Sequence, residues 1–281
     1  MGFGILLVLS AGFLHSIWNL YTKRSINKYV FLWYCQLASI LIFLPWTIVE
    51  WGNTELTSTG WWIIIASMLL HGLYLVLLAA TYSIGDLSQV YPIMRGTGPL
   101  LVPLLGVTLL NEKLSVFGWI GVVSIVIGIA MLSNISFKRN ETSTLKAPLL
   151  ALTVGICIAS YIIVDKIALE YAPAVVVNGA SNIAGVIALS WFAFRSTGMQ
   201  NELKVNWKII LLGGLIAPGG YLLFLFALNY GPVAQLAPMR EIGTVFGTIM
   251  GIYILREKQG KRRLITSIFI TAGVIVLGLW G

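Results

Sequence analysis

Two arginines lie in stretches of the chain that are otherwise apolar. Arg95 lies in VYPIMRGTGPLL (residues 90–101), and Arg240 lies in VAQLAPMREIGTVFG (residues 233–247). Each is predicted to lie roughly 12 Å into a helix, at a rise of about 1.5 Å per residue. A charge at that depth in a membrane costs ~2.5–3.5 kcal/mol on insertion scales, so it requires a counter-charge, water or a ligand. A guanidinium can pair with a carboxylate or phosphate through two parallel hydrogen bonds. We therefore interpret both arginines as receptors for an anionic group of a substrate.

Acidic and imidazole side chains in the same apolar runs offer an alternative. Asp165 and Glu241 are candidate counter-charges for Arg95 and Arg240. An intramembrane carboxylate or imidazole is also suited to carry a proton. Glu241, Asp165 and His15 are therefore the candidates for proton coupling.

Further polar and aromatic residues share helical faces, and such faces turn toward partner helices or an aqueous cavity rather than lipid. His15, Trp18 and Asn19 share one face, and His71 and Tyr74 share another. The candidates for substrate binding are Arg95, Arg240, Trp18, Asn19, His71, Tyr74, Tyr161 and Tyr221. Hydrogen bonding between helices alone is the alternative for each polar member of this set.

The sequence lacks the signatures of common enzymes. It contains no His-Glu-x-x-His, no Gly-x-Ser-x-Gly and no phosphate-binding Gly-Lys-Ser/Thr loop. Its two cysteines, Cys35 and Cys157, lie in separate apolar runs, so neither a disulfide nor a metal cluster is expected. We expect no enzymatic activity, no metal and no cofactor. A membrane enzyme acting on a lipid carrier is the alternative from a different class.

The elements that position these residues are predicted to be membrane-spanning helices. Hydrophobic residues make up 58% of the 281 residues and charged residues only 10%, against about 25% charged in a typical soluble domain. A helix needs about 20 apolar residues to cross a bilayer. Ten such runs are predicted, at residues 2–22, 30–49, 60–82, 87–110, 115–134, 147–168, 173–194, 208–229, 233–254 and 264–280. Pro92, Gly96, Gly98 and Pro99 predict a weakened helix around Arg95.

The chain repeats itself with a period near 145 residues. LSQVYPIMRGTGPLL…LLNEKL recurs as VAQLAPMREIGTVFG…ILREKQ, which matches Arg95 to Arg240 and Glu112 to Glu257. The arginine precedes the glutamate by seventeen positions in both copies. Five helices is an odd number, so the second copy of such a unit must run inverted through the bilayer.

The whole chain resembles the drug/metabolite transporter superfamily, in its EamA-type branch of duplicated five-helix carriers. The residues that carry the resemblance are the stretches around Arg95 and Arg240, the pairs Glu112-Lys113 and Glu257-Lys258, and Trp18 to Lys23. The glycine usual before each of those glutamates is replaced by Asn111 and Arg256. The resemblance implies an all-α integral membrane protein of ten transmembrane helices, in two inverted five-helix repeats at residues 1–140 and 141–281. It also implies secondary transport, without identifying a substrate.

Basic residues predict the orientation in the membrane. Fourteen of the eighteen Lys and Arg lie on connectors that follow odd-numbered spans, and short basic connectors stay in the cytoplasm. Both termini are therefore expected outside, whereas the resemblance implies both termini inside. The basic stretch REKQGKRR (256–263) is interpreted as facing anionic lipid headgroups rather than nucleic acid.

The predicted function is secondary active transport. We expect an exporter or exchanger of a small organic metabolite with an anionic group, either amino-acid-like or a phosphate or phosphonate. A proton-coupled carrier of cationic or drug-like compounds is the alternative. The expected partners are the solute and membrane lipids, without nucleic acid, and the expected location is the cell membrane, in a bacterium the inner (cytoplasmic) membrane. Gly243, Gly247 and Gly251 predict a close-packing face, either within a monomer or between the subunits of a homodimer.

Overall fold

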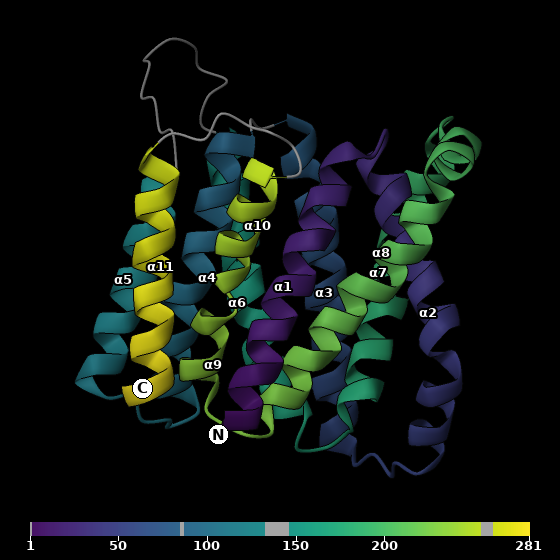
Figure 1. Cartoon of the computed structure of the whole chain (residues 1–281). Coiled ribbons are helices and arrows are strands. Elements are labelled where there is room, and N and C mark those ends of the chain that lie inside the picture. The colour runs from purple at the N-terminus through teal and green to yellow at the C-terminus, as the bar shows by residue number, and fades with distance from the viewer. Residues whose placement is uncertain (1, 85–86, 133–145, 254–260) are drawn as a thin grey trace.

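A computed structural model of the chain describes residues 2–84, 87–132, 146–253 and 261–281. These ranges contain eleven helices and no strand (Figure 1). The helices are α1 (Gly2–Arg24), α2 (Lys28–Gly52), α3 (Ser58–Ile84), α4 (Leu87–Leu109), α5 (Val116–Leu132), α6 (Lys146–Ala168), α7 (Ala174–Arg195), α8 (Met199–Leu228), α9 (Val233–Met239), α10 (Ile242–Tyr253) and α11 (Lys261–Trp280). The predicted boundary between residues 140 and 141, the pair Glu257-Lys258 and Arg256 lie outside the described ranges.

The helices follow the predicted apolar runs except at the eighth and ninth. Five of them, α2, α3, α6, α7 and α8, are long and apolar enough to cross a membrane, and shorter apolar helices cover Gly2–Trp18, Ile93–Leu109, Val116–Met131 and Ile265–Trp280. α8 begins at Met199, well before the predicted start at residue 208, and Glu202 in its first turn favours a helix N-terminus. α4 runs unbroken past Pro92 and Pro99, so the weakened helix predicted around Arg95 is not found there.

The break occurs instead in the second copy, within the ninth predicted run. α9 ends at Met239 and α10 begins at Ile242, which leaves Arg240 and Glu241 between them. Pro238 lies inside α9 and has no N–H to contribute to helical bonding. The chain passes the break through tighter bonds, such as that from the Glu241 N–H to the Pro238 carbonyl at 3.0 Å. Two charged residues therefore lie at a discontinuity inside an apolar run.

The contacts between helices follow a two-fold pattern. α1 packs along α8 as α6 packs along α3, and α2 packs along α8 as α7 packs along α3. Likewise, α4 packs along α6 as α9 and α10 pack along α1. Two further contacts join equivalent helices of the two halves, α2 with α7 and α5 with α11. Exchanging α1 to α5 for α6 to α11, with α9 and α10 counted as one, maps these contacts onto each other. This is the packing expected of an inverted repeat, and both termini lie at one end of the bundle (Figure 1).

A close backbone approach places α1 against the break. A Cβ on Gly12 would lie 2.8 Å from the Arg240 carbonyl oxygen, and a Cβ on Gly243 would lie 2.5 Å from the Gly12 carbonyl oxygen. Glycine at these two positions is therefore required by space. Gly247 also faces α1, so this part of the predicted glycine face packs within one chain. The surroundings of Gly251 lie outside the described residues.

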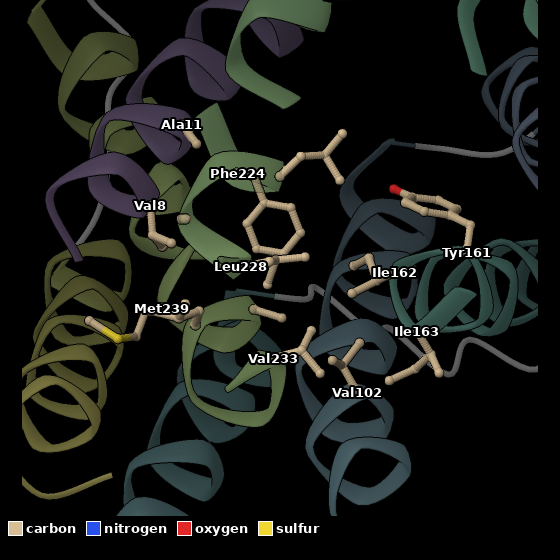
Figure 2. Packing of buried hydrophobic residues seen from close by; sticks show 14 of the residues in the cluster. Val8, Ala11, Val102, Tyr161, Ile162, Ile163, Phe224, Leu228, Val233 and Met239 are labelled. Carbon is tan, nitrogen blue, oxygen red and sulfur yellow. The ribbon is translucent and has the colours of Figure 1, made fainter. Parts of the chain in front are cut away.

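Buried apolar side chains hold the helices together around the break. The main cluster includes Val8 of α1, Val102 of α4, Phe224 of α8 and Met239 of α9, which Figure 2 shows within one packed group. A second cluster joins α1, α2, α3, α7 and α8 around Phe31. Between membrane helices, such packing is stabilised by van der Waals contact rather than by removal of the surfaces from water.

The orientation in the membrane can be tested at two exposed residues. Ser58 begins α3, Thr197 lies between α7 and α8, and these two connectors lie at opposite ends of the bundle (Figure 1). In a Cys35→Ser/Cys157→Ser background, Ser58→Cys should react with an impermeant maleimide on intact cells and Thr197→Cys should not, because the basic connectors stay in the cytoplasm. Both should react after permeabilisation. Reaction of only Thr197→Cys on intact cells would place the termini inside.

Candidate functional site

Asp165 on α6 is fully buried and receives hydrogen bonds from two other helices. The Ser67 hydroxyl on α3 donates to Oδ1, and the Tyr221 hydroxyl on α8 donates to Oδ2. His71 Nε2, also on α3, lies 2.8 Å from Oδ2. A buried carboxylate needs such partners, because the interior cannot solvate its charge. We refer to Asp165, Ser67, His71 and Tyr221 as the carboxylate cluster.

Aromatic rings from three helices gather at the carboxylate cluster. The Tyr161 ring lies 4.2 Å from the His71 ring between centroids, 5.3 Å from Tyr74 and 5.9 Å from Tyr221. Four of the predicted binding residues, from α3, α6 and α8, therefore come together. Ring pairs at such separations contribute ~0.5–1.5 kcal/mol each beyond their burial. Aromatic side chains with a few polar groups among them are also the usual lining of small-molecule sites.

Arg95 on α4 forms an ion pair with Glu241 at the helix break. Arg95 Nη1 and Glu241 Oε1 are 3.1 Å apart, and the two side chains are only 11% and 7% exposed. Ion pairing was one of the two roles that the sequence left open for Arg95. The pair compensates both charges and joins a helix of the first half to the break in the second. Glu241 Oε2 is buried and has no hydrogen-bond partner in the described part of the chain.

Arg240, the residue before Glu241 at the break, contacts rings rather than a carboxylate within the described ranges. Its guanidinium carbon lies 4.8 Å from the centre of the Phe224 ring and 5.6 Å from that of Tyr221, which is a cation–π arrangement. Its Nη1 is buried and has no hydrogen-bond partner among the residues that the structure describes. The break therefore presents an unused donor at Arg240 and an unused acceptor at Glu241.

The carboxylate cluster and the charged residues at the break form one continuous site. Tyr221 links them, because its hydroxyl donates to Asp165 while Arg240 lies over its ring. His15 of α1 lies close enough to interact electrostatically with both Arg95 and Arg240. Helices from both halves of the chain thus contribute to the site.

The formal charges of this site cancel. Two cations, Arg95 and Arg240, stand against two carboxylates, Asp165 and Glu241, when the histidines are neutral. A net charge added to a buried site must be compensated. The balance of charges in this site therefore favours a solute that has no net charge. The unused donor and acceptor suit a solute that can both accept and donate, such as one with hydroxyl groups or a zwitterion.

Two predicted binding residues are not placed at this site. Trp18 stacks on Phe31 of α2, with ring centroids 5.6 Å apart, in the second apolar cluster. The side chain of Asn19 lies outside the described residues. Conversely, Phe224 belongs to the site although it is not among the predicted binding residues. The sequence feature that could have identified Phe224 is its position three residues after Tyr221, which places both side chains on one face of α8.

The described residues hold no group of three His, Cys, Asp or Glu side chains arranged to bind a metal ion. Cys35 and Cys157 are buried, unpaired by disulfide and on different helices.

Comparison with known proteins places this architecture among transporters. The profile of the EamA-like transporter family matches residues 2–134 and 145–279. A putative sugar uptake protein of Listeria monocytogenes is 22% identical over 206 residues, which cover 71% of this chain and 70% of that protein. The glucose uptake protein GlcU of Bacillus subtilis is 29% identical over 210 residues, which cover 68% and 69% of the two chains. A solved crystal structure matches with a TM-score of 0.81 and 13% identity over 98% of this chain and 96% of that one, which shows a shared fold.

The family match covers both halves of the chain, on either side of residues 135–144. It confirms the resemblance read from the paired arginine stretches, and it agrees with the two-fold packing of the helices. Together with the apolar helices, it makes the protein a multi-pass membrane transporter. The chain belongs to the EamA-like transporter family.

Proposed function

We propose that the protein is a secondary active carrier that takes up a small polar solute without net charge, with a sugar as the first candidate. The observation that carries this proposal is the charge balance of the buried site, in which Arg95 is already paired with Glu241 at 3.1 Å. An anionic solute at Arg95 would have to displace that carboxylate. A hydroxylated solute can instead use the unused donor of Arg240 and the unused acceptor of Glu241.

The aromatic rings and the relatives also support a sugar. Tyr74 and Tyr161 place aromatic rings beside the carboxylate cluster, next to the ring of Tyr221 within it, as is usual in sites for small polar ligands. Two relatives of this chain bear names as sugar or glucose uptake proteins. Export was the direction expected from the family resemblance, and these names favour uptake instead.

An amino-acid-like solute is the second candidate. The free donor of Arg240 suits a carboxylate, and Glu241 Oε2 suits an ammonium group. A zwitterion of this kind would leave the charge balance of the site unchanged. This candidate retains the anionic group expected from the sequence, with Arg240 rather than Arg95 as its receptor.

We propose that the chain crosses the membrane ten times, with residues 1–140 and 141–281 as inverted halves and the site between them. One chain then contains a complete site, so a monomer suffices as the transport unit. The bacterial relatives favour the cytoplasmic membrane of a bacterium. Transport by rocking of the two halves would expose the site to each side in turn.

We further propose a proton gradient as the energy source, with Asp165 and His71 as the proton site. Asp165 Oδ2 lies 2.8 Å from His71 Nε2, so one proton can be shared between two groups of suitable chemistry. Glu241 is less suited, because its carboxylate is already paired with Arg95 at 3.1 Å. His15 remains a candidate close to both arginines.

Solute binding can be screened by thermal unfolding of the purified protein. D-Glucose should raise the melting temperature in a saturable way. At a glucose concentration of about a hundred times the dissociation constant, the free energy of unfolding should increase by about 2.7 kcal/mol. L-Alanine tests the zwitterionic candidate, and glucose 6-phosphate tests a net anion. Stabilisation by L-alanine alone would favour the second candidate. Stabilisation only by the phosphorylated sugar would contradict a requirement for a neutral solute.

Substitution of Arg95 and of Arg240 by alanine should affect the melting temperature and glucose binding differently in the same assay. Arg95→Ala leaves Glu241 buried without its cation and should cost ~3–5 kcal/mol of stability, most of which Arg95→Ala/Glu241→Gln should restore. Arg240→Ala removes cation–π contacts worth ~0.5–2 kcal/mol and breaks no ion pair that the structure shows among the described residues, so it should melt closer to wild type than Arg95→Ala does, while binding D-glucose at least about tenfold more weakly. Normal binding by Arg240→Ala would remove this residue from the site.

Proton coupling can be measured in proteoliposomes loaded with a pH gradient. Asp165→Asn should abolish gradient-driven accumulation of the solute and retain counterflow exchange, because exchange needs no net proton movement. Glu241→Gln is the matched comparison and should still accumulate solute, although with weaker binding. The reverse pattern would transfer the coupling role to Glu241.

A further inference from the structure

The connector between α8 and α9, residues 229–232, is held at both ends by charged side chains. The Lys166 ammonium of α6 donates to the carbonyl of Leu228, the last residue of α8, at 2.5 Å. The Glu112 carboxylate accepts from the backbone N–H groups of Val233 and Ala234, the first residues of α9, at 2.8 Å each. A cation at a helix C-terminus and an anion at a helix N-terminus are both favourable, because they oppose the partial charges of the helix ends.

The end of α4 is shaped to direct Glu112 toward α9. Asn111 has a φ of 54°, a left-handed conformation that asparagine tolerates better than most residues. The Glu112 N–H returns to the Gly106 carbonyl at 3.1 Å. A Cβ on Gly106 would lie 2.8 Å from Glu112 Oε2 and 3.2 Å from the Ala234 side chain. Glycine at position 106 therefore leaves room for the carboxylate and for the close approach of α9.

The two contacts differ in what they connect. Lys166 and Leu228 both belong to the second matched half of the chain, residues 145–279, whereas Glu112 belongs to the first, residues 2–134, and reaches across to the second. The Lys166 contact joins α6 to the end of α8, whereas the Glu112 contact joins the end of α4 to the start of α9, so only the Glu112 contact must break when α9 moves away from α4. Both side chains are half-buried, so water can replace the bonds when they open.

The Glu112 contact lies at one end of the short helix whose other end carries Arg240 and Glu241. α9 contains seven residues, or roughly 10 Å at 1.5 Å per residue. It lies at the end of the bundle where both termini lie (Figure 1). Fixing the start of so short a helix also fixes the position of the break that follows it.

We propose that Glu112 is a positioning residue that closes this end of the transporter by capping α9, an inference that rests on the proposed carrier function. Glu112 releases α9 whenever this end opens. Lys166 keeps the connector attached to α6 throughout the cycle. The bonds from Glu112 are suited to this role because charge-assisted hydrogen bonds are strong and yet exchange readily with water at a half-exposed position.

The test measures access to the inside of the closed end. Ala237 of α9 is buried between the Glu112 contact and the break, and Ala237→Cys in the Cys35→Ala/Cys157→Ala background supplies a single thiol. Its reaction rate with a hydrophilic maleimide should be slow when Glu112 is intact. Glu112→Gln removes the charge and one acceptor, so the rate should rise roughly tenfold or more.

Three further variants separate opening from unfolding. Gly106→Ala should also speed labelling, because its Cβ occupies the space of the carboxylate. Glu170→Gln removes an exposed glutamate after α6 and should label at the wild-type rate. Lys166→Met should lower the melting temperature and keep the labelling rate within about twofold of wild type, since its contact is with the end of α8 and not with α9.

The outcome does not depend on the identity of the solute. Wild-type labelling rates in both Glu112→Gln and Gly106→Ala, with the proteins still folded by their melting curves, would overturn the proposal. Faster labelling in these variants supports the closing role even where neither D-glucose nor L-alanine is transported. The failure of the carrier function and the failure of this inference are therefore separate results.

Discussion

A charge inside a helical bundle in a membrane must be matched where it lies, because neither lipid nor packed side chains can solvate it. Arg95 meets this requirement with Glu241, and Asp165 meets it with the donors of Ser67, His71 and Tyr221. Each of these sets draws on more than one helix. The helix packing is therefore constrained to bring the first half of the chain and the break in the second half to the same place.

The break between α9 and α10 contains residues that match a buried charge and residues that are proposed to bind the solute. It turns Glu241 toward Arg95 and leaves Arg240 over two aromatic rings. A guanidinium over ring faces keeps its hydrogen-bond donors available, because the rings compensate part of its charge without accepting those bonds. The same residues thus stabilise the bundle and retain hydrogen-bonding capacity, as the proposed carrier function requires.

The sequence was sufficient for an all-helical fold of apolar helices, for two matching halves and for the family, because long apolar runs and a repeated motif are properties of the chain alone. It misplaced the helix break, since Pro92, Gly96 and Pro99 make α4 look weaker than the run that contains Pro238. It could not choose a partner for Arg95, because the ion pair depends on how two distant helices pack. Trp18 shared a face with His15 in the sequence, yet its ring is directed to Phe31 of α2 by the packing of the second apolar cluster.

The contact of Gly12 with Gly243 beside the break restricts how the sequence can vary. A side chain at either position would meet the backbone of the other half, within 2.8 Å on one side and 2.5 Å on the other. If one of them became alanine, the clash of its methyl group could not be removed by a smaller residue at the other position, since that residue is already glycine. The two positions must therefore stay fixed together during divergence, although more than two hundred residues separate them. Lipid-facing positions of the same helices carry no such coupling and are free to exchange one apolar residue for another.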